Sequence, residues 1–135
     1  MIGLLLITHG KLARDFIEAA EAIAGVVEAV EYISIDDVKD SEKLRKVIEK
    51  KISSLDQGEG VLVLTDMFGG TPSNVALSFL DKNTIEIVTG INLPMVIAIS
   101  HNRNKQDLHK VADIAKNAGL RSISLASELL TPSGN

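Results

Sequence analysis

The chain has no cysteine, no tryptophan and only 3% aromatic residues among its 135 residues. Without cysteine it has neither disulfides nor thiol chemistry. So few aromatic side chains leave no stacking platform of the kind on which single-stranded nucleic acids bind. The net charge of -4 points the same way, since nucleic-acid binders need a basic face. The composition therefore argues against a nucleic-acid-binding protein.

Long apolar runs are also missing. No stretch approaches the roughly 20 residues that are needed to cross a bilayer. The N-terminus starts directly with an apolar run and lacks the basic segment of a signal peptide. These absences predict a cytoplasmic protein. Hydrophobic residues nevertheless make up 45% of the chain, so we expect one domain with an aliphatic core over residues 1–130 and a frayed tail over residues 131–135.

The apolar residues follow strand and helix patterns in turn. Short apolar or alternating runs predict strands at residues 2–7, 30–35, 60–65 and 84–88, the second of them nearer an edge. Apolar residues at helical spacing predict helices at residues 12–23, 44–55, 72–80 and 108–115. Residues 95–99 fit either a strand or a buried helix after Pro94, and residues 122–125 are predicted as a final strand.

This alternation predicts an α/β fold. We expect a three-layer sandwich in which a mostly parallel, flavodoxin-like sheet of strand order 2-1-3-4 carries helices on both faces. The C-terminal strand would be added to this sheet.

His9 follows the first predicted strand, within Thr8-His9-Gly10. It therefore lies at the carboxyl edge of the sheet, where open α/β folds bind their ligands. By itself His9 could equally be an ordinary turn residue. Asp66 ends the third strand and would lie beside His9, because the first and third strands are neighbours in the predicted order. A carboxylate on one ring nitrogen fixes the tautomer and leaves the other nitrogen as a nucleophile, although Asp66 could also merely begin a turn.

The segment after Asp66 predicts a place for an anion. Thr71 and Pro72 are expected as the N-cap and the first residue of a helix. Gly69 and Gly70 allow the backbone to approach a phosphate closely at the start of that helix. The same residues could be no more than a turn and a cap, and without His9 that would be the better interpretation.

Motifs for other chemistries are absent from the sequence. There is no Walker-type phosphate loop, no dinucleotide fingerprint and no G-x-S-x-G elbow, which argues against ATP- or NAD-dependent enzymes and α/β hydrolases. His101 and His109 lack helical metal-ligand spacing and have no cysteine to support them, so surface histidines are expected. We therefore expect no metal and no cofactor.

Three blocks of the chain resemble the EIIA component of the mannose-type sugar phosphotransferase system. They occur in the right order and are GLLLITHG at residues 3–10, LTDMFGGTPSN at 64–74 and TGINLPM at 89–95. The resemblance implies that His9 accepts a phosphoryl group from phospho-HPr and passes it to a mannose-type EIIB partner for carbohydrate uptake. It further implies that Asp66 holds the ring and that Thr71 contacts the phosphoryl group, with no nucleotide or metal.

The same resemblance implies a homodimer whose C-terminal strand is exchanged between subunits, and a helix after Pro94. Association with the membrane would be indirect, through EIIC and EIID only. Phe68 stands where this family often has Trp, and with Met67 it is expected to form an apolar rim that partner proteins contact.

Other functions stay open at this point. The chain could be a regulatory phosphoprotein whose phosphorylation at His9 is sensed by a partner. It could also be a phosphotransfer subunit for dihydroxyacetone kinase, which the Gly-Gly-Thr-Pro block makes less favoured. An unrelated His-Asp hydrolase is the remaining alternative.

Overall fold

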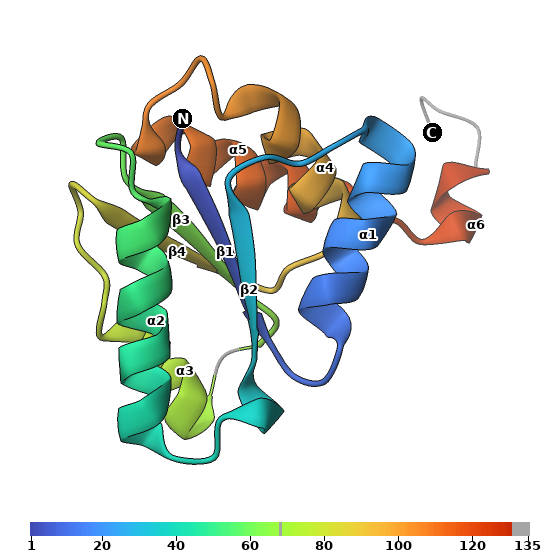
Figure 1. The fold of residues 1–135 in the computed structure, drawn as a ribbon. Helices are drawn as coiled ribbons and strands as arrows, with labels where there is room; N and C mark the ends of the chain where they lie inside the picture. Colours follow the sequence, from blue (N-terminus) through green and yellow to red (C-terminus); the bar gives the residue numbers. More distant parts are fainter. Residues whose placement is uncertain (68, 131–135) are drawn as a thin grey trace.

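The computed structural model of the chain describes residues 1–67 and 69–130. Its centre is one sheet of parallel strands in the order β2-β1-β3-β4 (Figure 1). The strands are β1 (Gly3–Thr8), β2 (Val30–Ser34), β3 (Val61–Thr65) and β4 (Ile85–Thr89). The predicted order is confirmed, and so is the edge position of β2.

Helices cover both faces of the sheet (Figure 1). One face carries α1 (Leu12–Ala24), α4 (Leu93–Asn102) and α5 (Leu108–Arg121). The other face carries α2 (Ser41–Leu55) and α3 (Gly70–Leu77). Two short helices, η1 (Ile35–Asp37) and α6 (Ala126–Leu129), follow β2 and α5. The predicted three-layer sandwich is therefore confirmed.

Strand β1 has a core on each side because successive side chains of a strand point to opposite faces. Leu4 and Leu6 pack with α1, α4 and α5, whereas Leu5 and Ile7 pack with α2 and α3. All four side chains are buried. This double burial is why the run reads as almost continuously apolar in the sequence.

The segment that fitted either a strand or a helix forms α4. Asn92 caps this helix, since its side-chain oxygen accepts a hydrogen bond from the Met95 N–H at 3.1 Å. Pro94 lies in the first turn, where its missing N–H is not needed. These two start signals outweigh the β-branched residues that follow.

The prediction of a strand at residues 122–125 is wrong for the single chain. These residues form a turn and an extended segment after α5, and α6 follows them. The physical reason is the path of the chain, which leads past the end of α5 and away from the sheet, so the segment has no strand to pair with (Figure 1). The frayed tail predicted at residues 131–135 lies outside the described residues.

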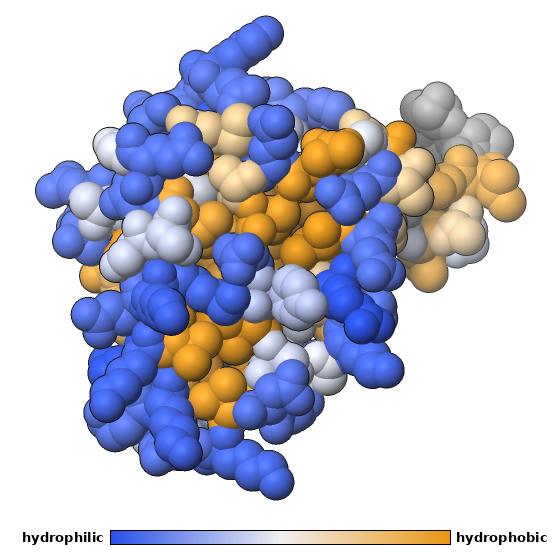
Figure 2. All heavy atoms as spheres, viewed as in Figure 1, coloured by the Kyte–Doolittle hydropathy of each residue, from blue (hydrophilic) through white to orange (hydrophobic). Residues whose placement is uncertain are grey.

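Apolar side chains remain on the surface of the C-terminal segment. They gather on α6, and others show between α1 and α2 (Figure 2). The most exposed around α6 are Ile123, Leu125, Leu129 and Leu130. None of the helices within residues 1–67 and 69–130 has the length and apolar character that crossing a membrane requires.

One buried cation ties the amino ends of two strands together. Arg103, at the end of α4, is only 2% exposed. Its Nη1 donates to the carbonyls of Ile2 and Ala29, both at 3.1 Å, and its Nη2 donates to the carbonyl of Glu28. Burial lowers the pKa of Arg103, but a guanidinium stays charged at any ordinary pH. These bonds satisfy carbonyls that precede β1 and β2.

Candidate functional site

His9 and Asp66 meet because β1 and β3 are neighbours with Ile7 opposite Thr65. The ring Nδ1 of His9 lies 2.9 Å from Oδ2 of Asp66. The same oxygen accepts the backbone N–H of His9, also at 2.9 Å, and the other carboxylate oxygen accepts the N–H of Met67. One carboxylate therefore holds both the ring and the backbone of the histidine.

The two side chains differ in their exposure to solvent. The side chain of His9 is 51% exposed and that of Asp66 only 13%. Because Nδ1 faces the carboxylate, Nε2 is the ring nitrogen left for an incoming group, and no described residue forms a hydrogen bond with it. The site therefore has one ring nitrogen, Nε2, that is free at the surface, while Asp66 holds the orientation of the ring through Nδ1.

The pKa values follow from this contact. The hydrogen bond to Asp66 is the main reason that the pKa of His9 is raised; partial burial opposes it, and the charges of Asp66 and Asp36 add to it. Burial acts to raise the pKa of Asp66, but hydrogen bonds from the backbone and ring of His9 outweigh it, so this pKa is lowered. Both shifts favour an imidazolium–carboxylate pair.

The chain after β1 is tied down by its own hydrogen bonds. The buried Thr8 hydroxyl accepts the N–H of Ala13 at 2.7 Å, which satisfies one of the free donors at the start of α1. The N–H of Gly10 donates to Oδ2 of Asp36 at 2.6 Å. Gly10 has φ +53, a conformation that glycine adopts without strain. The loop that carries His9 is thus held at several points.

The helix after Asp66 begins earlier than predicted. Gly69 is its N-cap and Gly70 its first residue, so the prediction of Thr71 as the N-cap is wrong. The cause is the glycine pair, whose φ values of 113 and 81 turn the chain into the helix before Thr71 is reached. Pro72 still fits, because N–H groups in the first helical turn have no intrahelical partner.

A small hollow lies between His9 and the start of α3. Gly69, Pro72 and Ser73 line it together with His9 and Asp66, whereas Thr71 is exposed and does not line it. Ser73 is therefore a hydroxyl that sequence reasoning missed, and its place in the first turn of the predicted helix could have indicated it. The role of Thr71 as a phosphoryl contact stays a prediction.

The predicted apolar rim falls partly outside the described residues. Phe68 is the residue that is not described, so its part in the rim stays a prediction. Met67 is 60% exposed beside the site, and Leu12 at the start of α1 is 42% exposed. Apolar side chains are thus available to a partner near His9.

The remaining histidines do not join His9. His109 lies on α5, where its Nδ1 is 3.7 Å from a carboxylate oxygen of Glu86 on β4, and His101 is near the end of α4. Among the described residues, no group of three or more His, Cys, Asp or Glu side chains could hold a metal ion.

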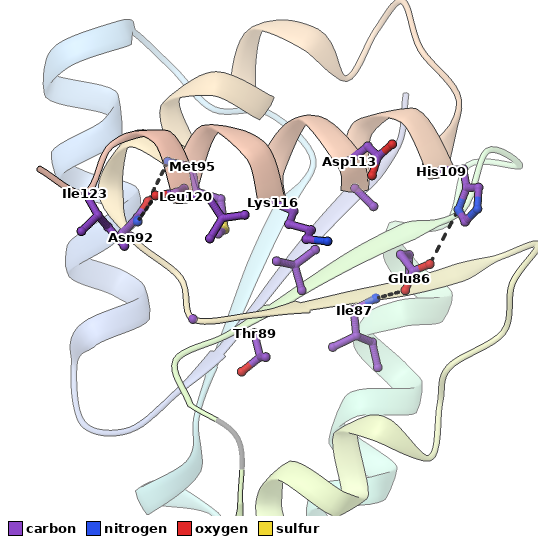
Figure 3. A pocket seen from close by; sticks show the side chains of 14 residues that line it. Glu86, Ile87, Thr89, Asn92, Met95, His109, Asp113, Lys116, Leu120 and Ile123 are labelled. Atoms are coloured by element: carbon purple, nitrogen blue, oxygen red, sulfur yellow. Dashed lines mark hydrogen bonds and ion pairs between the residues drawn. The ribbon is translucent and has the colours of Figure 1, made fainter.

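A second and larger hollow lies between the open edge of β4 and α5 (Figure 3). It measures about 540 Å³ and includes the Glu86–His109 pair at one end and Ile123 at the other. The outer edge of β4 has no strand partner among the described residues. At this edge Ile85 exchanges backbone hydrogen bonds with Asp81, and the Ile87 N–H donates to the Glu86 side chain, so a further strand could pair only along the part of the edge that these bonds leave open.

Comparison with known proteins shows the family to which this chain belongs. The sequence model of the family described as EIIA-man, PTS system fructose IIA component, matches residues 3–116. The chain belongs to this family. The EIIA-man family supplies components of the phosphotransferase system that carry phosphoryl groups in sugar uptake.

Two relatives show the extent of this similarity. The mannose-specific EIIAB component of Escherichia coli (strain K12) is 33% identical over 97 residues, which cover 71% of this chain and 30% of that protein. The chain therefore matches less than a third of the length of that EIIAB relative. The sorbose-specific EIIA component of Lacticaseibacillus casei is 30% identical over 132 residues, which cover 95% of this chain and 94% of that protein.

A solved structure agrees with the EIIA-man assignment. The crystal structure of a phosphotransferase-system EIIA component from Streptococcus agalactiae has a TM-score of 0.82 and 27% sequence identity to this chain. The similarity covers 95% of this chain and 99% of that one. Fold and family thus agree over almost the entire length.

Proposed function

We propose that this chain carries phosphoryl groups on His9, which it accepts from phospho-HPr and passes to a mannose-type EIIB partner during carbohydrate uptake. The observation that supports this most is the His9–Asp66 pair, in which Nδ1 faces a carboxylate and the ring stays half exposed. Membership of the EIIA-man family supports the choice of partners. With these partners we expect the protein to act in the cytoplasm. It would associate with the membrane only indirectly, through EIIC and EIID.

The proposed transfer runs between two histidines. Nε2 of neutral His9 attacks the phosphorus of the donor's phosphohistidine. The Nε2–P bond forms as the P–N bond to the donor ring breaks, and the electron pair of the broken bond returns to the donor ring. Asp66 holds the Nδ1 proton and stabilises the positive charge that develops on the His9 ring. The transfer to EIIB repeats these events with His9 as the donor.

The phosphoryl oxygens need hydrogen-bond donors during this transfer. The start of α3 lies across a small hollow from His9, and its first N–H groups have no helical partners. We assign phosphoryl binding to the backbone at Gly69 and Gly70, with Thr71 as the predicted hydroxyl contact. Ser73 lines the hollow and is the matched comparison for Thr71.

Phosphorylation with purified components tests this function. The protein is incubated with phosphoenolpyruvate, enzyme I and HPr, and acid-labile phosphate is measured by mass spectrometry. Wild type is expected to gain one phosphoryl group and His9→Ala none, while His109→Ala, the matched control, is labelled like wild type. Unlabelled wild type, or full labelling of His9→Ala, would show that the proposal is wrong.

A homodimer is a separate part of the proposal. The open edge of β4 and the hollow beside α5 could receive an extended segment from a second copy. The C-terminal segment carries exposed apolar residues, including Leu125 at 63% and Leu129 at 70% exposure. We propose that the segment of each subunit covers the β4 edge of the other.

Light scattering coupled to size-exclusion chromatography tests the dimer. Wild type is expected to elute with twice the monomer mass, and the double variant Leu125→Asp/Leu129→Asp as a monomer. Val26→Asp, at a position that is 83% exposed beyond α1, is the control and should behave like wild type. A monomeric wild type would contradict the proposal.

A further inference from the structure

Two consecutive N–H groups at the end of β1 are each bound by a carboxylate from a different neighbouring strand. The N–H of His9 donates to Asp66, which follows β3, at 2.9 Å. The N–H of Gly10 donates to Asp36, which follows β2, at 2.6 Å. Because β2 and β3 flank β1 on opposite sides, the loop that carries His9 is held from both sides.

The strand register accounts for this pairing. Thr8 lies opposite Ser34 in the β1–β2 pair. Gly10 and Asp36 are each two residues beyond that pair, and η1 turns the Asp36 side chain toward the loop. Asp36 is thus the counterpart of Asp66 on the other side of β1, although it does not touch the ring.

Asp66 and Asp36 are the two anions whose charges raise the pKa of His9. Helix α3 carries no charged side chain, and Lys11 and Arg14 lie at the start of α1. Asp37 follows Asp36 but forms no hydrogen bond with the described loop. Besides the hydrogen bond and charge of Asp66, the charge of Asp36 contributes to the raised pKa of His9.

We propose that Asp36 is a positioning residue for His9, which holds the Gly10 backbone from the β2 side while Asp66 holds the His9 backbone and ring from the β3 side. The proposal rests on His9 being the reacting group, as argued above. It adds that the N–H groups of His9 and Gly10 are already occupied. These two N–H groups are therefore not available to a phosphoryl group, and the proposed donors lie at the start of α3.

Two substitutions separate the hydrogen bond of Asp36 from its charge. Asp36→Asn can keep an oxygen that accepts the Gly10 N–H but removes the charge, whereas Asp36→Ala removes both. Asp37→Asn is the matched control, because it removes one exposed negative charge from the same short helix. All of these positions are exposed, so the variants are expected to fold.

The first measurement follows the His9 ring by NMR across a pH titration, which needs no phosphoryl donor. Both Asp36 variants are expected to shift the His9 titration midpoint to lower pH, and Asp36→Ala alone should also speed exchange of the Gly10 amide. Asp37→Asn should match wild type in amide exchange and shift the midpoint less. A midpoint and amide exchange that are the same in Asp36→Ala as in Asp37→Asn would overturn the proposal.

The second measurement is the rate of phosphoryl transfer from phospho-HPr. We expect Asp36→Ala to lower kcat about 10-fold with little change in KM, since displacement of a reacting group acts on the chemical step. Asp36→Asn should lower it less, and Asp37→Asn should match wild type. Equal rates in all variants would contradict the positioning role. Absent labelling of wild type would instead contradict the proposed function, while the NMR result would still decide whether Asp36 positions His9.

Discussion

The two ends of the sheet bind backbone groups with charges of opposite sign. At the amino ends, the buried Arg103 cation donates to carbonyls that precede β1 and β2. At the carboxyl ends, the Asp66 and Asp36 anions accept N–H groups that follow β1. Each end thus uses a side chain whose charge matches the backbone groups that it binds, a cation for carbonyl oxygens and anions for N–H groups.

The ends differ in what they leave accessible. Arg103 is 2% exposed and its two terminal nitrogens donate to the backbone, so it stabilises the fold and is not accessible to a ligand from solvent. His9 is half exposed, and its ring keeps a nitrogen that no described residue binds. The difference is that Arg103 binds only backbone, whereas Asp66 also orients a second side chain, His9, that solvent and partners can reach.

The largest expected effect of a substitution is on stability and comes from the amino end. Arg103→Ala removes the Arg103 donor from the carbonyls of Ile2 and Glu28 and leaves Ala29 with only the Leu4 N–H, and it also empties a buried site, so we expect a loss of about 4 kcal/mol in the free energy of unfolding. Urea denaturation measures it, and Arg103→Lys should recover part of the loss. In the folded fraction the His9 titration midpoint should not change. If Arg103→Ala were as stable as wild type, the contrast between the two ends would disappear.

The next largest effect is on the rate of phosphoryl transfer and comes from the carboxyl end. Asp66→Asn keeps the shape of the side chain but removes the charge that stabilises the ring, so we expect transfer from phospho-HPr to slow about 100-fold. Circular dichroism should show an unchanged fold. An unchanged rate would remove Asp66 from its assigned role, and a rate loss equal to that of Asp36→Asn would erase the difference between the two anions.

A smaller effect is expected at the start of α3. Gly69 has φ +113, and a Cβ placed there would meet no atom of the described residues within 4 Å, its chain neighbours left aside. Gly69→Ala should therefore cost only backbone strain, about 1–2 kcal/mol in the free energy of unfolding. Gly3→Ala is the contrasting variant, because its Cβ would lie 2.7 Å from Cβ of Leu55. Thermal unfolding of both should rank Gly3→Ala as the less stable protein.

The smallest effect is a dependence of stability on pH that only the carboxyl end should show. The raised pKa of His9 stabilises the folded state at pH below the unfolded value of 6.5, and this contribution is lost as pH rises through the folded pKa. The lowered pKa of Asp66 stabilises it above the unfolded value of 3.8, and this contribution is lost as pH falls through the folded pKa. The pair therefore stabilises most between these two limits.

Denaturant unfolding across the pH range checks this prediction. The difference in stability between wild type and Asp66→Asn should be largest at mildly acidic pH and should shrink above the raised pKa of His9. It should be small throughout, because the exposed ring is screened by solvent. A stability difference that does not vary between pH 4 and about pH 9 would contradict the pairing of the two charges.

Much of the fold could be predicted because its signals are local. The buried runs of β1 and β3 are visible as apolar stretches, and their parallel order places His9 and Asp66 at one edge. Residues 95–99 were ambiguous because a buried helix and a buried strand are both apolar throughout. The start of α3 was misplaced because Thr-Pro is a stronger local cap signal than the conformation of the two glycines before it.

The sequence by itself determined the strands of the sheet, most of the helices and the edge at which His9 lies, because these depend on the spacing of apolar residues along short stretches of chain. It left residues 95–99 open and placed a strand at residues 122–125 that the single chain does not form. Only the tertiary structure decided which backbone groups the charges bind. Asp36 reaches the Gly10 N–H across 26 residues, Asp66 reaches the His9 N–H across 57 and Arg103 reaches the Ile2 carbonyl across 101. Of these pairs only the approach of Asp66 to His9 could be predicted, and it came from the order of the strands. Hydrogen bonds across such separations depend on how strands pair and helices pack, so no local pattern announces them.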